Sequence, residues 1–185
     1  MQDNSDIVVC NFSFHDTEDR LNNKCFSIGE SKSITVSQAE AAKMIAEQKV
    51  ETAVWNKIYK RYVWEDLRFP EGRIFEGTYV IYDIFDQANL VSVMDEELIM
   101  HRKRAGSICN TYSLQHILDG NYATDYRAQC VKKHDYLPET CYKKMIRIPY
   151  HILIQSYLKY GYSNPEDKEG LQEIRNALTD PAYRK

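Results

Sequence analysis

Residues 74–94 read IFEGTYVIYDIFDQANLVSVM, and this stretch decides the expected fold. Its first half, residues 74–85, is rich in β-branched and aromatic side chains, which predicts a strand. The polar segment 86–89 predicts a turn, and residues 90–94 predict a returning strand. We therefore expect a β-hairpin over residues 73–95 at the centre of the sheet.

The segments on both sides of this hairpin alternate between strand and helix patterns. Residues 7–14 predict a first strand, and Ser37 with Glu40 three residues later predicts the capped start of a helix. Apolar spacing predicts a second helical stretch over 54–62. Acidic residues precede basic ones in 95–104, which complements a helix dipole and predicts another helix.

From residue 138 onward the pattern is helical. The length of 185 residues fits one core, and the hydrophobic and charged contents of 43% and 28% are typical of folded globular chains. The sequence therefore predicts a single α+β domain over residues 1–185. It would contain a small, mainly antiparallel sheet, helices packed on that sheet, and a helical C-terminal third.

Cysteine usage and the N-terminus bear on the cellular compartment. The number of cysteines is odd and none forms a CxxC pair, so neither a disulfide scaffold nor a cysteine zinc site is expected. The first residues are polar and acidic rather than basic and then apolar, and no apolar run has the length of a membrane span. We expect a cytoplasmic protein with no cofactor and no contact with a membrane.

Charge is distributed unevenly along the chain. Residues 1–97 carry 10 Lys and Arg against 18 Asp and Glu, whereas residues 98–159 carry 10 against 4. Segregated charge of this kind allows a basic face to meet an anionic partner. The alternative is that the two regions neutralise each other within the fold.

The basic region also contains many of the chain's 14 tyrosines, whose rings can stack on nucleobases while the cations contact phosphates. The predicted binding residues are His101, Arg102, Lys103, Arg104, Tyr112, Tyr126, Arg127, Lys132, Lys133, Lys143 and Lys144. We therefore expect a non-enzymatic interaction or regulatory protein. Its expected partner is a nucleic acid or an acidic protein.

A metal-dependent nuclease is the alternative. Gly77-Thr78-Tyr79, a second strand, and a following helix with Arg102 and Arg104 resemble the opening of GIY-YIG endonucleases over residues 74–118. The resemblance implies an arginine on the scissile phosphate and a glutamate metal ligand, for which Glu139 is the nearest candidate. The second strand of this chain lacks the tyrosine and glycine of that family.

A second nuclease pattern lies nearer the N-terminus. Asp16 is followed by Glu30-Ser31-Lys32, and a Glu-x-Lys strand after an acidic residue is the metal and base layout of another nuclease class. On a strand, Glu30 and Lys32 would share one face.

Overall fold

The computed structural model describes residues 4–15, 20–21, 27–28, 32–102 and 113–179. The chain divides into two compact units. Unit 1 comprises Met1–Pro70 and Gly77–Asn110, and unit 2 comprises Glu71–Glu76 and Thr111–Lys185. The α+β class is confirmed, while the expectation of a single domain stays a prediction.

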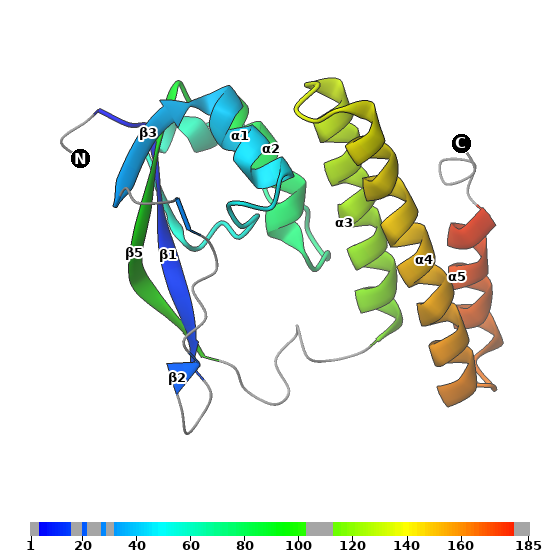
Figure 1. Ribbon diagram of the computed structural model, residues 1–185. Coiled ribbons are helices and arrows are strands. Elements are labelled where there is room, and N and C mark those ends of the chain that lie inside the picture. The colour runs from blue at the N-terminus through cyan, green and yellow to red at the C-terminus, as the bar shows by residue number, and fades with distance from the viewer. Residues whose placement is uncertain (1–3, 16–19, 22–26, 29–31, 103–112, 180–185) are drawn as a thin grey trace. The chain divides into compact units, whose positions relative to one another are not determined.

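Within the described residues, unit 1 contains one five-stranded sheet. Its strands are β1 (Ile7–His15), β2 (Arg20–Leu21), β3 (Ser33–Ser37), β4 (Lys57–Tyr59) and β5 (Leu90–Arg102). The order is β2-β1-β5-β3, and β4 also pairs with β1. The long strands β1 and β5 pair in parallel and run side by side (Figure 1), while the other pairings are antiparallel.

A register shift divides the β1–β5 ladder at Asn11. Ile7 lies opposite Val91 before the shift, and Phe14 lies opposite His101 after it. The Asn11 side chain satisfies the irregular backbone, because its Oδ1 accepts the Phe12 amide at 3.0 Å while its Nδ2 donates to Asp95. A bulge of this kind bends and twists a strand locally.

The helices of unit 1 are α1 (Gln38–Ala46), the 3₁₀ turn η1 (Arg61–Trp64) and α2 (Glu76–Asp86). The predicted cap is confirmed, since the Ser37 hydroxyl accepts the Glu40 amide at 3.3 Å. Figure 1 shows α1 and α2 on one side of β1 and β5. The fully buried core residues of these strands and helices are Ile7, Val9, Ile45, Ile81, Tyr82, Ile84, Phe85, Val91 and Val93.

The predicted strand over 74–85 is wrong, because Glu76–Asp86 forms helix α2. Val80, Ile81, Ile84 and Phe85 recur at helical spacing, and each is 3% exposed or less. A helix buries this whole set on one face, whereas a strand would divide it between two faces. The hairpin over 73–95 therefore does not exist.

The sheet is mixed rather than mainly antiparallel, which corrects the second part of the fold prediction. The predicted helix over 95–104 is a continuation of β5 as far as Arg102, and the last two positions lie outside the described residues. A parallel pair needs a long connection between its strands. That connection here contains β2, β3, α1, β4, η1 and α2.

In the described part of unit 2 the helices are α3 (Leu114–Lys133), α4 (Glu139–Ser163) and α5 (Lys168–Thr179). They share a buried cluster made of Ile117, Leu153, Ile174 and Ala177. Helices α4 and α5 agree with the helical pattern expected from residue 138 onward, and Asn164 caps α4 where an end was expected.

Residues 71–76 bind to the first half of α3. The Asp119 carboxylate, whose side chain is only 3% exposed, accepts a charged hydrogen bond from Arg73 at 2.6 Å and the Ile74 amide at 3.0 Å. The Phe75 ring packs edge-on against His116. The buried carboxylate therefore holds this segment in place within unit 2.

Candidate nucleic-acid interface

The predicted binding residues are distributed over both units. His101 and Arg102 end β5 in unit 1. In unit 2, α3 carries Tyr126, Arg127, Lys132 and Lys133, and α4 carries Lys143 and Lys144. Lys103, Arg104 and Tyr112 lie outside the described residues. The single basic surface over 98–159 therefore stays a prediction, and the site below is built from unit 1.

An aromatic cluster lies at the His101 end of the sheet. Trp55 contacts Phe12 and His101 with ring-centroid distances of 4.6 and 5.1 Å, and Phe14 contacts Phe12 and His101 at 5.4 Å each. The Phe12 ring is buried, whereas Trp55 keeps 43% of its surface exposed. The Trp55 indole is thus partly open to solvent while the rings beneath it are packed together.

The strand register explains this cluster. Phe12 lies opposite Ile99 and Phe14 lies opposite His101, and alternate residues of a strand share a face. Arg102 belongs to the other face of β5, with the exposed Leu98 and Met100. The end of the strand therefore carries rings on one face and the exposed Arg102 on the other.

Residues 55–69, which we call the aromatic–basic segment, were missed by the sequence analysis. Three large rings in it, those of Trp55, Tyr62 and Phe69, are each more than 40% exposed. Two exposed arginines, Arg61 and Arg68, lie between or beside them. Both tryptophans of the chain fall in this segment among basic residues, and that interleaving was the signal that could have revealed the surface.

The predicted helix over 54–62 is wrong, and this prediction is the reason that the exposed rings and arginines were not expected. Residues 57–59 form β4 instead, with Ile58 opposite Val8 of β1. Because side chains alternate along a strand, Lys57 is buried and Ile58 is 65% exposed. A helical face would have turned Ile58 toward the core.

A pocket of about 410 Å³ lies beside η1. Its walls are Arg61, Tyr62, Trp64, Glu65 and Arg68. Arg68 is held by its Nη1, which donates to the main-chain carbonyls of Trp64, Glu65 and Leu67 at 3.3, 3.2 and 2.6 Å. The Trp64 ring is also fixed, since it contacts the Tyr59 and Phe69 rings at 5.2 and 5.3 Å.

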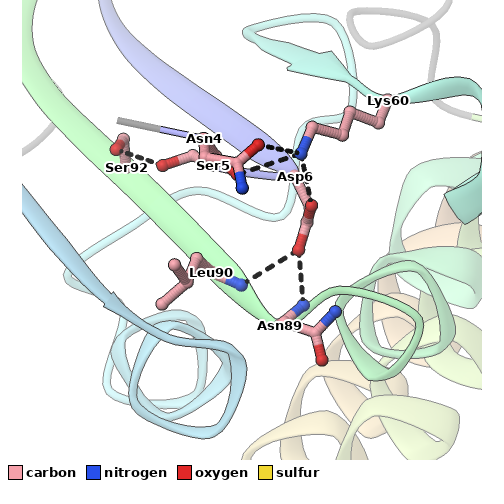
Figure 2. A network of polar contacts seen from close by, with 7 residues as sticks. All are labelled: Asn4, Ser5, Asp6, Lys60, Asn89, Leu90 and Ser92. Atoms are coloured by element: carbon pink, nitrogen blue, oxygen red, sulfur yellow. Dashed lines mark hydrogen bonds and ion pairs between the residues drawn. The ribbon is translucent and has the colours of Figure 1, made fainter. Parts of the chain in front are cut away.

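A polar network centred on Asp6 anchors the chain just before η1 (Figure 2). The Asp6 carboxylate accepts hydrogen bonds from Lys60 Nζ at 2.9 Å and from the amides of Asn89 and Leu90 at 2.8 and 3.1 Å. Lys60 also donates to the Asn4 carbonyl. The network therefore ties the start of β1, the start of β5 and the residue before η1 together.

The protonation of Asp6 reflects these contacts. Burial by itself raises the pKa of this carboxyl, but the hydrogen bonds from Lys60 and the two amides outweigh burial and hold the pKa well below its usual range. The carboxylate is therefore charged at neutral pH. Burial, and after it the neighbouring Asp6 carboxylate, raises the pKa of the Tyr62 hydroxyl.

Buried Lys57 fixes the loop that carries Trp55. Its Nζ donates to the carbonyls of Glu51 and Ala53 and to Asn56 Oδ1, so all three ammonium donors have acceptors. Burial lowers the pKa of Lys57 to about 7. Since only 7% of the residue is exposed, Lys57 positions the loop rather than meeting a ligand.

The structure contradicts the first strand of the GIY-YIG-like pattern. The acidic residues of the second nuclease pattern lie outside the described residues. Gly77-Thr78-Tyr79 lies in helix α2, so it cannot supply the first strand of a GIY-YIG arrangement. Asp16 and Glu30 lie outside the described residues. Among the residues that the structure does describe, no three His, Cys, Asp or Glu side chains gather as a metal site requires.

No family model matches this chain, and no curated protein matches it. In the described part of the chain, no helix combines the length and the apolar character needed to cross a bilayer. The residues of the aromatic–basic segment and their contacts are thus the basis for assigning a function.

Proposed function

We propose that this protein binds single-stranded nucleic acid through the aromatic–basic segment and the adjoining end of β5. The observation that carries the proposal is the interleaving of exposed rings with exposed arginines over residues 55–69. Rings stack on bases of any sequence, and guanidinium groups contact the phosphates between them. We propose a binding role without catalysis, in the cytoplasm and without a cofactor.

The rings favour a nucleic acid over an acidic protein partner. An acidic protein surface would use the cations but would have no particular need for flat ring faces, whereas each unpaired base presents one. Trp55 is supported from below by Phe12 and His101, which leaves part of the indole open to a base. Arg102 at the end of β5 and Arg61 after β4 supply the phosphate contacts that we propose.

Stacking is tested by titrating a short oligothymidylate or oligouridylate into the protein. Trp55→Ala should weaken binding by about 1–3 kcal/mol, which is the usual value of one base–aromatic stack. Ile58→Ala is the matched control, because Ile58 is 65% exposed in the same segment but is not aromatic. Equal effects of the two substitutions would contradict stacking on Trp55.

Phosphate contact is tested by measuring affinity over a series of salt concentrations. Replacing Arg61 or Arg102 by alanine should reduce the slope of log K against log salt by about 0.7 for a single strand. Arg175→Ala, an exposed position on α5, should leave the slope unchanged. If no single strand binds even at low salt and polyglutamate binds instead, the proposal fails in favour of an acidic protein partner.

A further inference from the structure

We propose that the pocket beside η1 selects guanine in the bound strand. This inference rests on the proposed function and adds a base preference to it. The pocket combines three chemistries in one place: the guanidinium groups of Arg61 and Arg68, the aromatic rings of Tyr62 and Trp64, and the carboxylate of Glu65. A nucleotide offers a phosphate, a flat base and a hydrogen-bonding edge, which match these three in turn.

The carboxylate decides between the bases. An ionised carboxylate only accepts hydrogen bonds, and it has two oxygens with which to do so. Guanine presents two adjacent donors on its Watson–Crick edge, N1–H and N2–H. Adenine and cytosine place an acceptor beside their single donor group, and uracil and thymine place one donor between two acceptors. Guanine is therefore the base whose edge suits Glu65, in the manner of single-strand recognition on that edge.

The pocket is organised before a ligand arrives. Arg68 is fixed by three main-chain carbonyls through one nitrogen, Nη1. The Trp64 ring contacts the Tyr59 ring edge-on and the Phe69 ring at a tilt. Groups held in this way lose little freedom on binding, so a base can stack on Tyr62 or Trp64 while its phosphate meets an arginine.

The charges around the pocket are compatible with a phosphate. Arg61 and Arg68 outnumber Glu65 in the lining. Lys60 is engaged by Asp6 at 2.9 Å and is not needed for the ligand. Asp66 is an exposed carboxylate next to Glu65 but is not part of the lining, which makes it a matched control for the effect of charge alone.

The two tryptophans allow the pocket to be measured by itself. In a Trp55→Phe variant, Trp64 is the one remaining tryptophan, and its fluorescence reports the pocket. Titration of this variant with GMP, IMP, AMP and CMP should give an affinity for GMP about tenfold or more above those for AMP and CMP. IMP, which lacks the N2 amine, should fall between them.

Glu65→Gln should reduce the ratio of GMP to AMP affinity to within about threefold, because the amide supplies one acceptor and one donor in place of two acceptors. Asp66→Asn removes the same charge one residue away and should leave the ratio unchanged. Equal affinities for all four nucleotides, or an unchanged ratio in Glu65→Gln, would overturn the guanine preference.

A second variant separates this inference from the proposed function. In Trp64→Phe, the remaining Trp55 reports binding of a short oligonucleotide at the aromatic cluster. If oligonucleotides quench Trp55 while GMP leaves Trp64 unaffected, the guanine pocket is refuted and single-strand binding stands. If neither tryptophan responds to any oligonucleotide or nucleotide, both proposals fail.

Discussion

Replacing Asp6 by asparagine removes the charge at the centre of the network that joins β1, β5 and η1. The substitution keeps the size of the side chain and leaves one oxygen acceptor. The new NH₂ group is itself a donor, and it must face either Lys60 or the amides of Asn89 and Leu90. Any loss of stability is therefore an effect of charge and hydrogen bonding rather than of packing.

The magnitude follows from burial. Breaking a buried ion pair costs about 3–5 kcal/mol when one charge is left without its partner. The Asp6 side chain is only 8% exposed, but that of Lys60 is 33% exposed and regains some hydration. Adding the weakened amide hydrogen bonds, we expect Asp6→Asn to lower the free energy of unfolding of unit 1 by about 3 kcal/mol.

The pH dependence of stability distinguishes the loss of a charge at Asp6 from a loss of packing. Because the folded-state pKa of Asp6 is depressed, its stabilisation is complete above the unfolded-state value of about 4 and is lost as pH falls below that value. At pH 3 the unfolded state binds the proton that the folded state resists. The gap between wild type and Asp6→Asn should therefore narrow by about 1 kcal/mol between pH 7 and pH 3.

Urea unfolding followed by tryptophan fluorescence measures this gap, since Trp55 and Trp64 both belong to unit 1. Asp66→Asn is the control, because it removes an exposed carboxylate close by in the sequence. A gap that stays constant between pH 7 and pH 3, or a loss no larger than that of Asp66→Asn, would refute the assignment of Asp6 as a charged anchor.

Two further predictions concern the other buried charges. Lys57→Met leaves the carbonyls of Glu51 and Ala53 without their donor and should cost at least about 3 kcal/mol in urea unfolding. Because the pKa of Lys57 in the folded state is lowered to about 7, the unfolded state binds more protons than the folded state above that pH. The wild-type protein should therefore gain stability from pH 7 toward pH 10, and Lys57→Met should lack that gain. In unit 2, Asp119→Asn should release residues 71–76 and speed tryptic cleavage after Arg73, as followed by mass spectrometry, whereas Asp125→Asn should not.

The candidate site shows which inferences the sequence supported and which it did not. The binding role of His101 and Arg102 stays a prediction. Both residues end β5, where His101 contacts the Trp55 ring and Arg102 is exposed on the other face of the strand. Residues 55–69 were passed over, because apolar spacing at Val54 and Ile58 fits a helix as well as a strand. Only the pairing of β4 with β1 turns Ile58 outward and brings the segment to the surface.

Local signals were sufficient where the determining contacts are close in the sequence. The run of apolar residues at 7–14 gave β1, the Ser37 hydroxyl and the Glu40 amide gave the start of α1, and the pattern after Pro138 gave the helices that follow. Each of these depends on interactions between neighbours or on a single stripe of side chains.

The α+β class, the first strand, the first helix cap and helices α4 and α5 could thus be predicted from the sequence. The tertiary structure decided that residues 76–86 are a helix and that 90–102 are one strand parallel to β1. Both stretches contain β-branched, aromatic or charged residues in patterns that fit a helix and a strand equally well when only neighbouring residues are considered. The choice is made by the partners that bury them, and β1 lies more than seventy residues away from β5 along the chain.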